Sequence, residues 1–290
     1  MKFGINNWVY ADEPLEETFK RLAKYDYDAV ELKGELSLYD IDEIKELCSK
    51  YGMCISSILP WLLDGLPGRD LSNPDQYDRQ TAIAYCFDVI QFASKVGAPI
   101  VLMLPFPANR TSPIGNPPTP ELWETAAKLE WNNAVKSVKE IAEYAKDFDI
   151  TLAVEPINRY ETYQLTTVDN VLRFINDVKM ENVKINLDIF HMNIDEKDLP
   201  EAIRKAGSLL VHMHCADSNR EAPGRGHTDF QDIIAALHDI EFSGTMVFEP
   251  VPPGADPGIA ILQPENIPLR DIYAKESIEG IKEIERRFHE

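Results

Sequence analysis

Four short apolar runs in the second half of the chain each end on an acidic or histidine side chain: TLAVE (151–155), KINLD (184–188), LLVHMH (209–214) and TMVFE (245–249). Helical periodicity separates them, over residues 168–178, 201–206 and 230–240. Short β-branched runs that alternate with amphipathic helices are typical of βα units built on a parallel sheet.

The first half of the chain repeats this alternation. Its strand candidates are residues 2–8, 29–33, 53–59 and 100–104, and the remaining helices are 15–25, 41–51, 74–96, 121–148 and 272–288. Asn73-Pro74 and Thr119-Pro120 have the pattern of helix starts, and Gly52 and Gly97 stand where helices are expected to end.

Eight βα units in 290 residues predict an α/β fold, a single (β/α)₈ TIM barrel over residues 1–290, with the active site at the C-terminal mouth of the strands. An open doubly wound sheet is the alternative. It would need a glycine-rich turn after the first strand, whereas residues 3–11 contain only Gly4.

The charge balance disfavours two classes of partner. The chain has 29 Lys+Arg against 49 Asp+Glu, a net charge of −20, which repels nucleic acid and anionic membranes. It has no apolar run long enough for a transmembrane helix, and MKFGINNW at the N-terminus is not a signal peptide. We therefore expect a cytoplasmic protein with no nucleic-acid or membrane partner.

The last four strand candidates end on Glu155, Asp188, His214 and Glu249. In a barrel these ends meet at one mouth. A proline follows each glutamate and holds it in an extended conformation at the end of its strand. Three carboxylates this close need a cation, and a set with one imidazole suits Mn²⁺, Mg²⁺, Co²⁺ or Fe²⁺. The sequence therefore predicts a divalent metal site.

Side-chain alternation along a strand predicts two further layers. Residues two positions before the strand ends face the barrel interior: Ala153, Asn186, His212 and Val247. The residues between face the helices: Val154, Leu187, Met213 and Phe248.

Polar side chains also follow three of these strands. Glu161, His191 and Arg220 stand in the segments after Glu155, Asp188 and His214. Two long proline-rich loops, residues 105–120 and 251–268, are expected to lie over the mouth.

At this point the chain resembles a known family. EPINRYET (155–162), LDIFHMN (187–193), HMHCADSNREAPGRGH (212–227) and MVFEP (246–250) resemble motifs of the D-tagatose/D-psicose (D-allulose) 3-epimerases. These ketose 3-epimerases belong to the sugar phosphate isomerase/epimerase superfamily of TIM barrels. The resemblance is specific over residues 151–250 and departs in MLPFPANR (103–110) and the C-terminal loop.

The resemblance implies roles for particular residues. Glu155, Asp188, His214 and Glu249 would hold the metal, and Glu155 and Glu249 would also form the catalytic acid/base pair. The O1–O3 end of the sugar would be bound by Glu161, His191 and Arg220. For the far end of the sugar, the sequence offers the aromatic side chains of Trp8, Trp61 and Phe106.

The predicted function is metal-dependent isomerisation, the epimerisation of a free ketose of the D-psicose, D-tagatose or L-ribulose type at C3. One carboxylate removes the C3 proton, the metal stabilises the enediolate, and the opposed carboxylate returns a proton. We expect Mn²⁺ or Co²⁺, with Mg²⁺ as an alternative, and a homo-oligomer, either dimer or tetramer. Aromatic contacts alone would discriminate weakly between sugars beyond C3.

Other functions remain open at this stage. An aldose–ketose or hydroxypyruvate-type isomerase is the nearest alternative, followed by a dehydratase of cyclic ketoses. A DNA repair enzyme of the endonuclease IV type needs a histidine-rich zinc site, but no histidine precedes His191. A sugar-binding protein without activity would not need two opposed glutamates on one metal.

Overall fold

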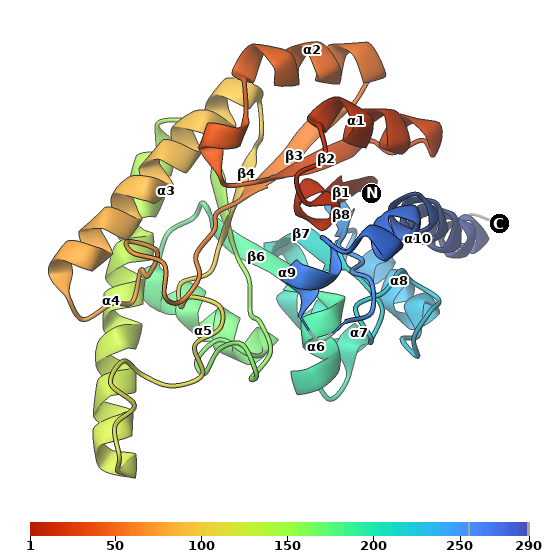
Figure 1. The fold of residues 1–290 in the computed structure, drawn as a ribbon. Coiled ribbons are helices and arrows are strands. Elements are labelled where there is room, and N and C mark those ends of the chain that lie inside the picture. The colour runs from red at the N-terminus through yellow and green to blue at the C-terminus, as the bar shows by residue number, and fades with distance from the viewer. Residues whose placement is uncertain (255, 289–290) are drawn as a thin grey trace.

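Eight parallel strands close into a barrel in the computed structural model, which describes residues 1–254 and 256–288 (Figure 1). Each strand pairs with the next in the chain, and the last pairs with the first. The strands are β1 (Lys2–Asn6), β2 (Ala29–Lys33), β3 (Cys54–Leu59), β4 (Ile100–Met103), β5 (Thr151–Val154), β6 (Val183–Asp188), β7 (Leu210–Cys215) and β8 (Thr245–Phe248). The predicted barrel is confirmed, whereas the single-domain organisation stays a prediction.

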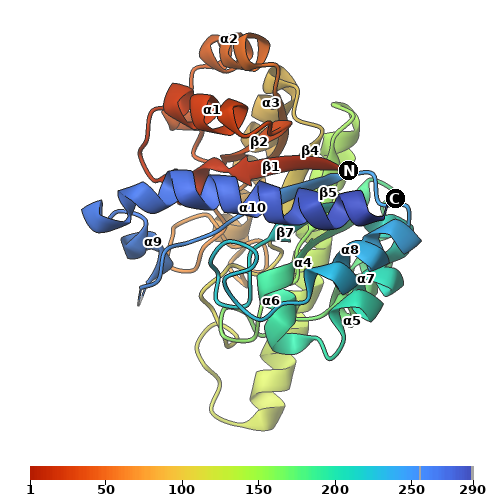
Figure 2. The same ribbon diagram turned by 90° about the vertical axis from the view of Figure 1, so that its right-hand side faces the viewer.

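Helices cover the outside of the barrel, and α10 lies between α1 and α8 (Figure 2). The α-helices are α1 (Leu15–Lys24), α2 (Ile41–Tyr51), α3 (Gln76–Val96), α4 (Pro120–Lys146), α5 (Val168–Val178), α6 (Ile189–Asp195), α7 (Leu199–Ala206), α8 (Phe230–Asp239), α9 (Pro257–Ala260) and α10 (Ile267–Arg287). Within residues 1–254 and 256–288, no helix combines the length and the apolar character needed to cross a membrane.

Most helix ends follow the expected local chemistry. Gly52 and Gly97 adopt left-handed conformations at the ends of α2 and α3, and Thr119 caps α4. The expected start at Asn73-Pro74 is wrong, because the Asp75 carboxylate accepts the backbone N–H groups of Tyr77 and Asp78 and caps α3. The Asn73 side chain instead accepts the Asp75 N–H in a turn before the helix.

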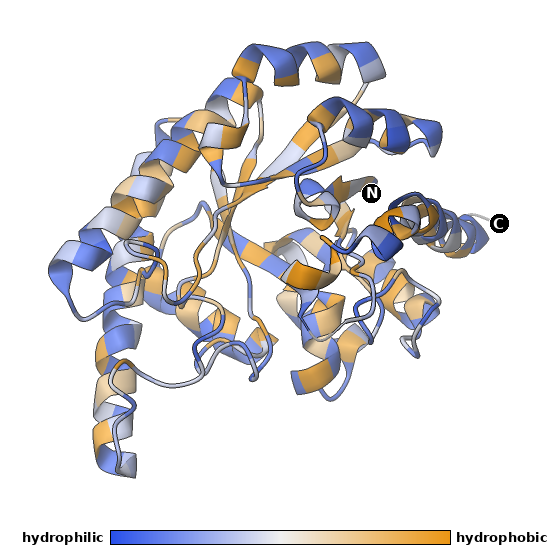
Figure 3. Ribbon diagram, viewed as in Figure 1, coloured by the Kyte–Doolittle hydropathy of each residue, from blue (hydrophilic) through white to orange (hydrophobic). Residues whose placement is uncertain are grey.

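The layer of side chains predicted to face the helices is buried. The side chains expected to face the helices, Val154, Leu187, Met213 and Phe248, are all fully buried. The Phe248 ring stacks on Phe3 at 6.2 Å and meets the edge of Tyr27 at 6.0 Å. Figure 3 shows hydrophobic residues along the strands, and hydrophobic and hydrophilic residues in alternation along the helices. The apolar contact between barrel and helices leaves the interior and the mouth free for polar groups.

Candidate active site

The four side chains at the ends of the last four strands lie together at the mouth of the barrel. Glu155 and Glu249 directly follow β5 and β8, Asp188 ends β6, and His214 lies near the end of β7. Their exposed fractions lie between 0% and 5%. His214 Nδ1 is 3.4 Å from Glu155 Oε1 and 3.5 Å from Glu249 Oε2. Two glutamates from strands that are not neighbours thus meet at one imidazole nitrogen.

This cluster has the donor set of a divalent metal site. Ligand atoms of Asp188, His214 and Glu249 lie within 4.8 Å of one another, as do those of Glu155, Asp188 and His191. Buried carboxylates repel one another unless a cation lies between them. Oxygen atoms with one imidazole nitrogen suit Mn²⁺, Co²⁺ or Mg²⁺, so the residues present fit the expected metal.

Glu31 on β2 is a site residue that the sequence analysis missed. Its carboxylate accepts hydrogen bonds from His214 Nε2 at 3.0 Å and from His212 Nε2 at 2.9 Å. Asn6 Nδ2 and the Ser57 hydroxyl also donate to it. These distances are those of hydrogen bonds, so this buried group is satisfied without an ion.

The position of Glu31 determines the orientation of His214. A carboxylate that accepts one ring N–H fixes the tautomer and presents the other nitrogen as a ligand. With Nε2 bound to Glu31, Nδ1 faces Glu155 and Glu249. The sequence feature that could have identified Glu31 is its place inside the apolar strand AVELK (29–33). Burial of an unpaired charge there would cost folding free energy, so the residue needs a partner.

The charges of the cluster compensate one another only in part. Burial disfavours ionised Asp188, but Arg220 and then His191 outweigh burial and hold the pKa of Asp188 below its usual range. Burial raises the pKa of Glu249 against the opposing charges of His214 and Arg220. Burial also opposes the imidazolium of His214, but Glu249 and Glu31 raise its pKa well above the usual value. The carboxylates therefore favour positive charge at the imidazole, which a bound cation can supply in place of the proton.

The three polar residues that follow the strands also reach this site. Arg220 Nη2 donates to Glu249 Oε2 at 2.6 Å, and its Nη1 donates to Asp188. His191 Nε2 lies 3.6 Å from Asp188 Oδ2. The Glu161 carboxylate accepts a hydrogen bond from the side chain of Asn158, whose amide also contacts His191 Nδ1. The structure thus brings all three next to the strand-end cluster.

A cavity of about 780 Å³ extends outward from the cluster. Its wall includes Glu161, His191 and Arg220, together with residues of the segment after β1, of β2 and of the loop after β3. The cavity is also lined by part of the proline-rich segment 251–268, namely residues 256–258 with Ile261 and Leu262. Residue 255 of this segment lies outside the described residues.

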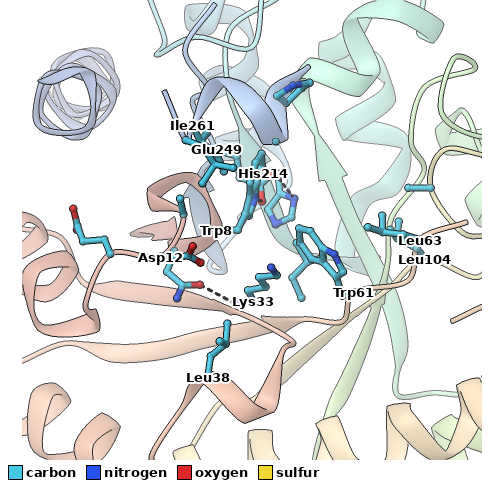
Figure 4. Close-up of a pocket in the computed structure, with 18 of the residues that line it drawn as sticks. Trp8, Asp12, Lys33, Leu38, Trp61, Leu63, Leu104, His214, Glu249 and Ile261 are labelled. Carbon is cyan, nitrogen blue, oxygen red and sulfur yellow. Dashed lines mark hydrogen bonds and ion pairs between the residues drawn. The ribbon is translucent and has the colours of Figure 1, made fainter. Parts of the chain in front are cut away.

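The three aromatic residues expected at the far end of the sugar have different positions. Trp8 and Trp61 line the cavity (Figure 4). The Trp8 indole N–H donates to Glu249 Oε1 at 2.8 Å, so Trp8 lies next to the reacting end. The expectation for Phe106 needs correction, because this buried ring packs against Trp131 and Phe174 under α4 and α5 instead of lining the cavity.

Arg110 connects the loops that surround the mouth. Its Nη1 donates to Asp70 Oδ2 at 2.5 Å, and its Nη2 donates to Glu130 Oε2 at 2.8 Å and to Ser72 Oγ at 2.7 Å. Its backbone N–H donates to the carbonyl of Glu161 at 3.1 Å. The guanidinium of Arg110 therefore joins the loop after β3 to helix α4, and its backbone N–H joins both to the segment that carries Glu161.

Replacing Arg110 by Met is expected to lower the free energy of unfolding by about 3–5 kcal/mol, because Asp70 and Glu130 would remain buried without their cation. Urea denaturation measures this change. Arg204→Met is the matched control: it removes an exposed ion pair with Asp239 and should leave stability nearly unchanged. Equal stability of Arg110→Met and the unmodified protein would contradict a structural role for Arg110.

Comparisons with known proteins agree with this architecture. The chain matches the family model described as xylose isomerase-like TIM barrel over residues 19–267. It is 31% identical over 263 residues to the D-psicose 3-epimerase of Ruminiclostridium cellulolyticum, a match that covers 86% of this chain and 84% of the relative. It is 41% identical over 121 residues to the D-psicose 3-epimerase of Agrobacterium fabrum, covering 42% of each chain.

A solved structure has a similar fold over nearly the whole chain. The crystal structure of D-psicose 3-epimerase from Clostridium cellulolyticum with D-tagatose superposes with a TM-score of 0.85 at 27% identity. The superposition covers 98% of this chain and 99% of that one.

Proposed function

Because this chain belongs to the ketose 3-epimerase family of xylose isomerase-like TIM barrels, whose named members are carbohydrate isomerases, we propose that it inverts C3 of a free ketose. The substrate class is that of D-psicose, D-tagatose and L-ribulose. The observation that carries the proposal is the pair Glu155 and Glu249, both buried and both within 3.5 Å of His214 Nδ1. Inversion requires two acid/base groups at one carbon, and this pair supplies them.

Glu155, Asp188, His214 and Glu249 would hold a divalent cation, Mn²⁺ or Co²⁺ with Mg²⁺ as an alternative. When bound, such a cation acts as a Lewis acid toward the carbonyl and hydroxyl oxygens of the sugar. Glu31 keeps the His214 ring oriented through Nε2, which leaves Nδ1 available as the ligand.

The proton transfers fall to the two glutamates. C3 of a ketose bears an acidic hydrogen because it lies next to the C2 carbonyl. One carboxylate removes that proton, and the other, already protonated, delivers a proton to the opposite face of C3. The pair then has the protonation state needed for the reverse reaction, so no outside acid or base is consumed.

The remaining polar groups position the sugar. Arg220 and His191 border Asp188 and can donate to the oxygens that gain charge as the proton leaves. Glu161 lines the same side of the cavity and can accept from a sugar hydroxyl. Trp8 and Asn6 donate to Glu249 Oε1 and hold this carboxylate in place.

The position of solvent hydrogen in the product tests the proposal. Ketohexoses and ketopentoses are incubated in D₂O with the protein and Mn²⁺ or Co²⁺, and the products are separated by chromatography and examined by NMR. We expect the C3 epimer with one deuterium at C3. Deuterium at C1 with an aldose product would identify the aldose–ketose isomerase instead, and no product from any ketose would overturn the proposal.

Two further features remain predictions that rest on the sequence. We propose a homo-oligomer, either dimer or tetramer, which sedimentation can measure, and a cytoplasmic location. The net charge of −20 supports a neutral sugar as ligand in preference to nucleic acid.

A further inference from the structure

Lys33, the last residue of β2, places a cation on the cavity wall. Its side chain alternates with Leu32 and points to the same side of the strand as Glu31. The Lys33 ammonium lies 4.2 Å from the centre of the Trp61 ring, which also lines the cavity (Figure 4). The Lys33 ammonium thus provides a hydrogen-bond donor beside the aromatic face of Trp61.

The Lys33 ammonium has no acidic partner within hydrogen-bond or ion-pair distance among the described residues, although its backbone N–H is fixed by Asn7 Oδ1 at 2.8 Å. The other lysine or arginine of the cavity wall, Arg220, is bound to Asp188 and Glu249. Of these two side chains on the described cavity wall, Lys33 is therefore the one whose ammonium has no acidic partner.

The position of Lys33 relative to the reacting groups determines which part of a sugar it can meet. The eight strands follow one another around a closed barrel, so β2 and β3 lie across the mouth from β6 and β7. The groups for the reacting end, including His191 and Arg220, follow β6 and β7. A sugar held there would have Lys33 and Trp61 on the wall across the mouth.

The surroundings of Lys33 favour a neutral ligand over an anionic one. Asp12, Glu43 and Asp256 also line the cavity and are exposed near its rim. Their charge repels a phosphate or carboxylate. A hydroxyl group can accept from Lys33 while its C–H face packs on Trp61, so a neutral polyhydroxyl chain fits this wall.

We propose that Lys33 is the residue that selects the ketose beyond C3, by donating a hydrogen bond to a hydroxyl oxygen on C4–C6 while Trp61 packs on the adjoining carbons. This assignment rests on the proposed 3-epimerase function. It replaces the expectation of loose, purely aromatic selection at the far end, because a charged donor discriminates between hydroxyl configurations more strongly than an apolar face does.

The test compares Lys33→Met with Lys45→Met, an exposed lysine of α2 that does not line the cavity. For each protein, kcat/KM is measured on D-psicose, D-tagatose, D-fructose and D-sorbose, and the binding of the same sugars is measured by calorimetry. We expect Lys33→Met to reduce the preference between sugars that differ at C4 by about 10- to 100-fold, the range for a hydrogen bond from a charged donor. Lys33→Arg should keep part of the preference, and Lys45→Met should keep all of it.

The outcomes separate the two proposals. An equal loss of kcat/KM on every sugar, with the preferences unchanged, would overturn the role of Lys33 and leave the 3-epimerase function intact. Sugar binding that depends on Lys33 without any deuterium entering C3 would overturn the 3-epimerase function and retain the binding role. Binding unaffected by Lys33→Met would overturn the binding role directly.

Discussion

Glu155→Gln and Glu249→Gln are each expected to lower the rate of C3 inversion by about 10³-fold or more, within the range that a positioned acid or base contributes. Glutamine keeps the size of the side chain but cannot accept the C3 proton. Turnover is followed by chromatography, and elemental analysis reports whether the metal is retained.

The exchange of hydrogen at C3 gives a sharper result than the loss of turnover. Each variant keeps one working carboxylate, which can remove and return a proton on its own face of the sugar. We therefore expect each variant to exchange the C3 hydrogen of one epimer with D₂O without inverting it, and the two variants to act on opposite epimers. Exchange of the same epimer by both variants would contradict the assignment of one glutamate to each face.

A matched substitution separates this effect from a general loss of charge. Glu46 is exposed on α2 and does not line the cavity. Glu46→Gln removes the same charge and should leave the rate of inversion unchanged.

Exhaustive chelation is expected to abolish activity, and addition of Mn²⁺ or Co²⁺ is expected to restore it. Glu155, Asp188 and Glu249 place three carboxylates around one imidazole, and a divalent cation is the group that this donor set fits. Activity and metal content are measured before chelation, after it and after re-addition.

The same experiment has a readout that does not depend on activity. A metal that binds only the folded state stabilises it, by about 2.7 kcal/mol when its concentration is one hundred times Kd. We expect Mn²⁺ or Co²⁺ to raise the melting temperature of the native protein and to have little effect on Asp188→Asn. Full activity in protein shown to hold no metal would exclude a metal-dependent mechanism.

The candidate site could be predicted from the second half of the sequence because its residues stand at the ends of strands. A strand end is a local feature: an apolar run, then Glu155 or Glu249 before a proline. Eight apolar strand candidates predict a closed barrel. In such a barrel the C-terminal ends of all strands meet at one mouth, so no knowledge of contacts between distant residues is needed to place them together. The structure places Glu155, Asp188, His214 and Glu249 within one cluster accordingly.

The residues that the sequence analysis missed or misplaced depend on contacts between distant segments. Phe106 is an aromatic residue in a loop that follows a strand, which is why the sequence suggested a sugar contact. In the structure its ring packs against Trp131 of α4 and Phe174 of α5. Glu31 was not singled out, because its partners His212 and His214 lie 181 and 183 residues away. A pattern of neighbouring residues does not show which residues so far apart in the sequence come into contact.

The sequence by itself determined the (β/α)₈ architecture and the set of groups at its mouth, because hydrophobic period and strand-end chemistry are properties of neighbouring residues. The tertiary structure alone decided that Nε2 of His214 binds Glu31 while Nδ1 faces Glu155 and Glu249. It alone also decided that the Trp8 indole donates a hydrogen bond to Glu249. It also decided that Lys33 reaches the cavity beside Trp61. These features depend on where side chains from different strands meet, and that is fixed only when the ring of strands closes and the core packs.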